Sequence, residues 1–121
     1  MKLRIRGDSI RLRLTRTEVA AVAQGQLVQE FTGFPGGIRF AYSLEPRADA
    51  AGISASFSDG RIVVALPLAQ ALAWANGDSV TLQSGGILIE KDFACLKPRA
   101  HEQEDESDMF PNPNLSHGHC R

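Results

Sequence analysis

KLRIRGDSIRLRL, at residues 2–14, alternates apolar with basic side chains, but the alternation changes phase in the middle. Apolar residues occupy odd positions before Gly7 and even positions after Asp8, so one continuous strand would place them on opposite faces of a sheet. A two-residue turn at Gly7-Asp8 removes the conflict, and glycine at the first central position suits a type II′ turn. The stretch therefore predicts a β-hairpin with one apolar and one basic face, although a bulge in one long strand would also reconcile the phases.

The predicted hairpin places its cations side by side, because its register pairs Lys2 with Arg13 and Arg4 with Arg11. A two-stranded ribbon fits the major groove of DNA, and cations on such a ribbon can bind phosphates. The alternative is that these long side chains only solvate the outside of the sheet and discourage pairing at its edge. The candidate nucleic-acid-binding residues are Lys2, Arg4, Arg6, Arg11 and Arg13.

The same unit is repeated about 52 residues later in the chain, so that residues 2–46 correspond to residues 53–96. Each copy has two short strands around a turn, a short helix ended by glycine, and a second strand pair around a Gly-Gly-Ile step. The loop before that step is three residues shorter in the second copy. Since neither copy is large enough to bury its own apolar face, the repeat predicts one pseudo-symmetric domain over residues 1–96.

Local signals place the helices and turns of both copies. Thr15-Arg-Thr-Glu18 forms a capping box at the start of the first helix, and Pro67 suits the first position of the second helix. Asp59-Gly60 is a strong hairpin turn. The predicted fold is mainly β with two short helices, an α+β class in which two ββαββ repeats form one small barrel or sandwich.

Composition predicts a soluble globular protein, because the 121 residues are 43% hydrophobic and 22% charged. No apolar run approaches the about 20 residues that span a bilayer, and the start of the chain lacks the apolar stretch of a secretion signal. Two cysteines, Cys95 and Cys120, do not make a disulfide framework. We therefore expect a cytoplasmic protein that makes no membrane contact.

The apolar pattern ends near residue 97, so residues 97–121 are expected to form an acidic, extended or disordered tail. The net charge is −1, but residues 2–16 sum to +5 and residues 101–110 to −5. The tail is expected to bind a basic protein partner, to fold back onto the basic face, or only to keep the protein soluble. Its candidate partner-binding residues are Glu102, Glu104, Asp105, Glu106, Asp108 and Phe110.

The chemistry-bearing residues do not form a catalytic set. His117, His119 and Cys120 are candidate metal ligands, but their spacing fits no structural zinc template. No nucleophile with its base, pair of carboxylates or metal triad stands out along the chain. The sequence therefore predicts neither an enzyme nor a cofactor.

Two motifs suggest a relationship to known families. Gly7-Asp-Ser-Ile-Arg-Leu-Arg-Leu14 is followed by a helix start at Thr15, and the second copy adds Val64-Ala-Leu-Pro67 and Gly77-Asp-Ser-Val80. This pattern resembles AbrB-like transition-state regulators and MazE-type antitoxins, with Thr15 in place of the usual proline. The resemblance implies exchanged hairpins in a small barrel, like a fused dimer, with DNA contacts from the basic strands and a partner for an acidic C-terminal extension.

The whole chain also resembles a family of short uncharacterised bacterial proteins. The shared segments are the opening MKLRIRG, Glu90-Lys-Asp-Phe-Ala-Cys95 and Phe110-Pro-Asn-Pro113. We therefore expect a non-enzymatic binding module. It is either an AbrB/MazE-like DNA-binding regulator or a protein-interaction module whose basic face binds its own acidic tail or an acidic partner, and the sequence leaves its oligomeric state open.

Overall fold

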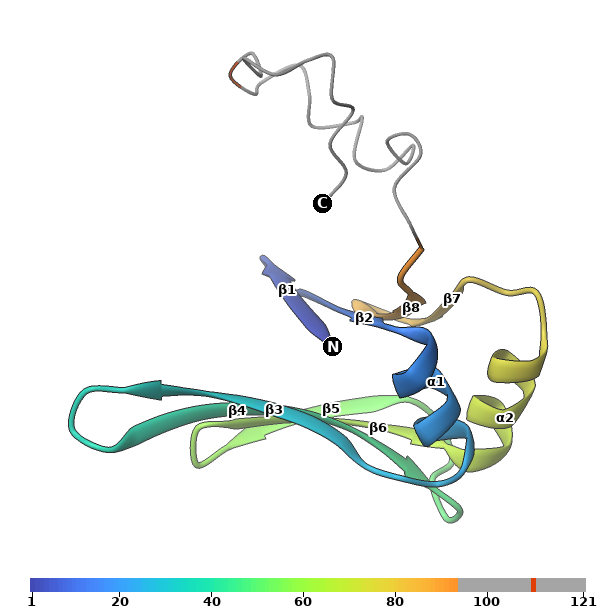
Figure 1. The fold of residues 1–121 in the computed structure, drawn as a ribbon, viewed down its shortest axis with the longest axis horizontal. Coiled ribbons are helices and arrows are strands. Elements are labelled where there is room, and N and C mark those ends of the chain that lie inside the picture. Colours follow the sequence, from blue (N-terminus) through green and yellow to red (C-terminus); the bar gives the residue numbers. More distant parts are fainter. Residues whose placement is uncertain (94–109, 111–121) are drawn as a thin grey trace.

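The computed structural model describes residues 1–93 and Phe110, and its regular elements form two four-stranded sheets and two helices. The sheets lie as two layers, and both helices lie at one end of them (Figure 1). In chain order the elements are β1 (Lys2–Arg6), β2 (Ser9–Leu14), α1 (Arg16–Ala23), β3 (Val28–Phe34), β4 (Ile38–Arg47), β5 (Ser54–Ser58), β6 (Arg61–Pro67), α2 (Leu68–Asn76), β7 (Thr81–Ser84) and β8 (Ile87–Lys91). The predicted α+β class is confirmed, and of its two alternatives the sandwich is right and the closed barrel is wrong.

The two repeats exchange hairpins. The first sheet has the order β1-β2-β8-β7 and the second the order β3-β4-β6-β5, so each sheet takes one hairpin from each repeat. The hairpins join through parallel pairs, β2 with β8 and β4 with β6, while all other pairs are antiparallel. A single hairpin is marginal in water, and the exchange gives every hairpin a second one to pair with.

The first hairpin has the predicted register, with Lys2 opposite Arg13 and Arg4 opposite Arg11. Its turn residue Gly7 has a positive φ of 54°, as a type II′ turn requires at that position. In the equivalent turn of the second repeat, Asp59 and Gly60 both have positive φ, at 52° and 72°, as in a type I′ turn. The hairpin interpretation is therefore confirmed over the bulge.

The core lies between the inner faces of the sheets and one side of each helix. Trp74 of α2 is only 2% exposed, and its Nε1 donates a hydrogen bond to the carbonyl of Val80 at 3.1 Å. The buried cluster consists of Leu12, Leu14, Val19, Val22, Leu44, Ile62, Val64, Leu66, Ala71, Trp74 and Ile89. No helix in the described part of the chain is long and apolar enough to cross a membrane.

Both helices begin near the predicted residues. The Thr15 hydroxyl accepts from the Glu18 amide at 3.3 Å, and the Thr15 amide donates to Glu18 Oε1 at 2.9 Å, which confirms the capping box. Pro67 is the N-cap of α2 and the last residue of β6, so the prediction that it is the first helical residue is wrong by one position. Its ψ of 135° is extended because the strand continues through it.

Candidate functional site

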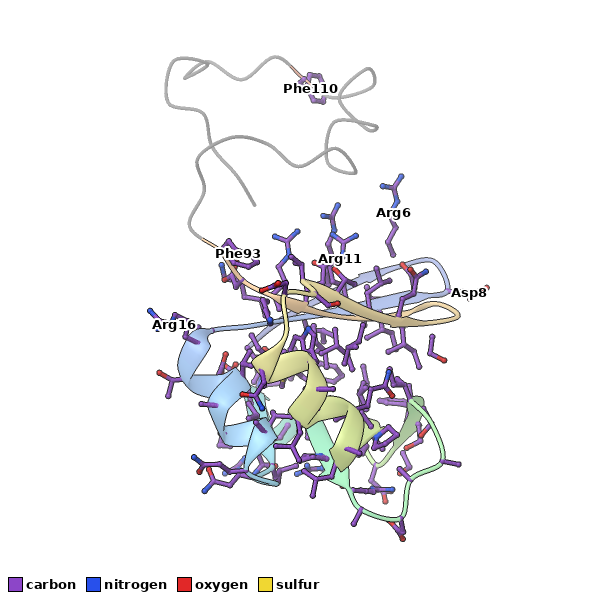
Figure 2. The ribbon with its side chains drawn as sticks, turned by 90° about the vertical axis from the view of Figure 1, so that its right-hand side faces the viewer. Arg6, Asp8, Arg11, Arg16, Phe93 and Phe110 are labelled. Atoms are coloured by element: carbon purple, nitrogen blue, oxygen red, sulfur yellow. The ribbon has the colours of Figure 1, made fainter. Side chains whose placement is uncertain are left out.

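The outer face of the first sheet gathers all five cations that the sequence predicted as binding residues. Strand alternation places the core residues on one side of β1 and β2 and the cations on the other. Figure 2 shows Arg6 and Arg11 on the side of this sheet that faces away from the helices. We call this surface the arginine face; it consists of Lys2, Arg4, Arg6, Arg11 and Arg13.

Like charges lie directly opposite each other on the arginine face. Arg4 is opposite Arg11, and Lys2 is opposite Arg13, across the β1–β2 ladder. Directly opposed like charges destabilise an antiparallel pair. The arrangement therefore reduces stability unless anions approach it.

Glu90 of β8 is one such anion, and the sequence analysis did not assign it to this site. β8 runs parallel to β2, which places Glu90 opposite Arg13. Glu90 Oε1 lies 3.2 Å from Arg13 Nε and 3.6 Å from Arg11 Nε, and Oε2 accepts from the Thr81 hydroxyl at 3.3 Å. Glu90 and Arg13 are 4% and 7% exposed, so each needs the other to offset the loss of hydration.

The remaining cations are more accessible. Lys2 Nζ lies 3.2 Å from Asp92 Oδ2, but the lysine side chain is 72% exposed and such pairs are weak. Arg4 and Arg6 are exposed, whereas Arg11 is partly buried. From within residues 1–93, the carboxylates of Glu90 and Asp92 therefore approach this face at its β8 side.

The second sheet has no equivalent of the arginine face. Because the repeats are related by 52 positions on these strands, each cation has a counterpart on β5 or β6. These counterparts are Ser54, Ser56, Ser58, Val63 and Ala65. The two repeats thus share a fold, but only the first one carries this row of cations on its opening hairpin.

The amino terminus of the chain holds β1 in place beside the second sheet. The Met1 ammonium lies 2.5 Å from both Glu18 Oε2 and Glu30 Oε2, and Tyr42 donates its hydroxyl hydrogen to the Met1 carbonyl at 3.1 Å. Burial disfavours the ammonium ion, but hydrogen bonds and charge from Glu18 and Glu30 outweigh it and raise its pKa. The pKa of Glu18 is lowered, since burial is outweighed by the ammonium and by the Thr15 amide. This contact connects α1, β3 and β4 to the strand that carries Arg4 and Arg6.

A model of the family described as Family of unknown function (DUF7009) matches residues 1–114. The chain belongs to this family. The DUF7009 match confirms the predicted relationship to a family of uncharacterised proteins and covers both repeats. No curated protein and no solved structure matches the chain, so the resemblance to AbrB-like and MazE-type proteins is not confirmed.

Other surface sites in the described part of this DUF7009 protein bring together fewer charged or metal-binding side chains. A shallow hollow at the connection between the repeats is lined by residues 47, 49–54 and 65, and its charged side chains are Arg47 and Asp49. Arg47 pairs with Glu45 at 2.7 Å, and the lining contains no histidine or cysteine. In the described part of the chain, no three acidic, histidine or cysteine side chains group as metal ligands.

The predicted tail residues lie almost entirely outside the described residues. Phe110 is described and is 96% exposed. The others are Glu102, Glu104, Asp105, Glu106 and Asp108, together with the candidate metal ligands His117, His119 and Cys120. Their proposed roles therefore stay predictions from the sequence.

Proposed function

We propose that this protein is a non-enzymatic binding module that holds an acidic, extended polypeptide segment against the arginine face. The observation that carries this proposal is that like charges lie directly opposite each other across one ladder, Arg4 opposite Arg11 and Lys2 opposite Arg13. A carboxylate close to neighbouring cations offsets their repulsion, as Glu90 does for Arg11 and Arg13 on β2. The pair formed by Arg4 and Arg11 offers the same opportunity to a carboxylate from a partner.

The spacing of the cations favours an extended segment as the partner. Lys2, Arg4 and Arg6 recur at every second residue of β1, about 6.8 Å apart along the strand. An extended segment with acidic residues at every second position has the same repeat. β1 is also the edge strand of its sheet, so its backbone is open to pairing with such a segment.

The chain itself contains acidic residues at this spacing. Acidic residues occur at every second position at Glu102, Glu104, Glu106 and Asp108. The chain leaves β8 at Lys91, and Asp92 already contacts Lys2 of the arginine face. A tethered segment has a high effective concentration at a nearby surface. The partner is therefore either this acidic segment or an acidic segment of another protein with the same spacing.

The test uses the full chain with its own acidic segment neutralised, so that Glu102, Glu104, Asp105, Glu106 and Asp108 become the corresponding amides. A labelled peptide with the natural sequence of residues 100–110 is then titrated and followed by fluorescence anisotropy. We expect binding that weakens with salt and that weakens about tenfold or more in Arg4→Gln/Arg6→Gln, because hydrogen bonds to charged groups contribute about 1.5–3 kcal/mol each.

The control for this experiment is Arg39→Gln, which removes an exposed cation from the second sheet. Its affinity for the peptide should equal that of the unsubstituted host. Equal binding by the host and by Arg4→Gln/Arg6→Gln would refute the proposal. Arg13 is unsuitable for this test, because its removal would take a partner from buried Glu90 and change stability.

DNA binding is the second candidate, and the basic ribbon of β1 and β2 favours it. Glu90 reduces the positive charge available to phosphates, and the counterparts of the five cations on the second sheet are uncharged. A duplex titrated into the same neutralised host at two salt concentrations separates the candidates. Tighter binding of the duplex than of the peptide, with a salt slope reduced in Arg4→Gln/Arg6→Gln, would favour DNA.

A further inference from the structure

The hairpin of β3 and β4 extends beyond the rest of the molecule. β3 and β4 contain 7 and 10 residues, whereas their counterparts β7 and β8 contain 4 and 5. The ribbon of this hairpin projects past the ends of the other strands, away from the helices (Figure 1). Near its tip, Phe31, Phe34 and Ile38 are 57%, 52% and 65% exposed. An isolated hairpin is marginally stable in water, so three exposed large apolar side chains on it indicate a contact surface.

The outer edge of this hairpin is the least protected of the four sheet edges. The edge strand β1 carries Lys2, Arg4 and Arg6, and these like charges discourage its pairing with β1 of a second copy. The edge strands β5 and β7 are short and contain several serines or other polar residues. β3 is longer, and its one charged residue, Glu30, is already paired with the Met1 ammonium.

We propose that β3 is the contact between two copies of this chain, which pair antiparallel about Phe31 into one continuous eight-stranded sheet. In this register Phe31 lies opposite Phe31 of the second copy, and Phe34 lies opposite Val28 of the second copy. Glu30 lies opposite Thr32, and Gln29 lies opposite Gly33. Every large apolar residue thus meets another apolar residue, and no charge meets a like charge.

Neighbouring two-fold registers are less favourable. Pairing centred on Glu30 would place two carboxylates opposite each other, which is destabilising. Pairing centred on Thr32 would place Glu30 opposite Phe34 and would leave Val28 without a partner. The strand is therefore self-complementary in one register, which is the property that a two-fold contact between identical subunits requires.

The second copy is the occupant that these observations favour, because the same strand supplies both halves of the contact. The Arg39 guanidinium already lies 4.7 Å from the centre of the Phe31 ring, which covers one side of this ring with a cation. Cross-strand aromatic pairs stabilise the pairing of two strands. The proposed contact would also satisfy the outward backbone groups of β3.

The experiment is sedimentation velocity of the full chain over a wide concentration range, compared with Phe31→Lys. We expect the native chain to dimerise and the variant to have a dimer dissociation constant at least about tenfold higher, because two ammonium groups replace two aromatic rings at the two-fold axis. The matched control is Phe57→Lys, which introduces the same charge at a 67% exposed phenylalanine on the opposite edge of the same sheet. Its dissociation constant should equal that of the native chain.

A cross-link tests the register without a charge change. Phe31→Cys is made in a chain with Cys95→Ser and Cys120→Ser, and Phe57→Cys in the same background is the control. Directly opposed residues of an antiparallel pair have Cα atoms about 4.5–5.5 Å apart, which a disulfide can bridge. We expect oxidation to give a covalent dimer with the Phe31→Cys variant and none with the control. A native chain that is monomeric at every concentration, or a dimer that Phe31→Lys leaves intact, would overturn the proposal.

Discussion

At the level of single residues, the amino terminus contributes a pH-dependent part of the stability. The pKa of the Met1 ammonium is raised from its ordinary value of 8.0, since Glu18 and Glu30 outweigh the effect of burial. A raised pKa means that the stabilisation is complete below pH 8 and is lost as the pH rises through the folded value. The lowered pKa of Glu18 acts in the other direction, so that its contribution is lost as the pH falls through its folded value.

We therefore expect the free energy of unfolding to decrease as the pH rises above about 8, and to do so more steeply in the native chain than in Glu18→Gln/Glu30→Gln. The double variant should also be less stable near neutral pH by about 1–2 kcal/mol, because the charged partners of the ammonium are gone. Urea unfolding of both proteins between neutral and alkaline pH measures this. Parallel pH profiles would show that the ammonium does not depend on these two carboxylates.

Glu90 shows which part of the candidate site the sequence could not reveal. The alternation in residues 2–14 was sufficient to predict the hairpin, its register and the common face of its cations. The carboxylate of Glu90 contacts both Arg11 and Arg13, yet Glu90 lies 77 residues after Arg13 in the chain. No local sequence pattern connects β2 to β8, because their parallel pairing depends on how the two sheets pack around one core.

At the level of elements, two turns from different repeats meet at the end of the first sheet. The Ile10 amide donates to the Gly86 carbonyl at 2.8 Å, which brings the β1–β2 turn against the β7–β8 turn. A Cβ on Gly86 would lie 2.5 Å from the Asp8 carbonyl oxygen, so no side chain fits there without a backbone shift. The Gly-Gly-Ile step, which the sequence analysis placed between the strands of a predicted pair, is thus also a point of close contact between the repeats.

Gly86→Ala should destabilise the protein by about 1–3 kcal/mol, because the added methyl group forces the two turns apart. Gly52→Ala is the control, since no atom lies within 4 Å of a Cβ at Gly52 and its φ is not in the left-handed region. Thermal unfolding followed by circular dichroism gives both values. A Gly86→Ala protein as stable as Gly52→Ala would mean that the turns can separate at no cost.

At the level of the whole molecule, each repeat depends on the other for both of its hairpins. The first sheet needs β8, and the second sheet needs β6, and in each case the neighbouring strand comes from the other repeat. We expect fragments 1–50 and 51–121 each to lack a cooperative unfolding transition, and an equimolar mixture to regain one. Calorimetry of the fragments and of their mixture measures this. A cooperative transition in fragment 1–50 alone would show that hairpin exchange is not required for folding.

The sequence by itself determined the elements, because alternation, capping and turn chemistry act over a few residues. It therefore indicated the two repeats, the register of the first hairpin and the arginine face. Only the tertiary structure decided which hairpins share a sheet, that the sheets form a sandwich, that Glu90 lies among the arginines, and that the long β3–β4 hairpin keeps an unprotected edge. These features depend on contacts between distant segments, and similar hairpins with one apolar face could pair in several ways until the core and the buried charges select one.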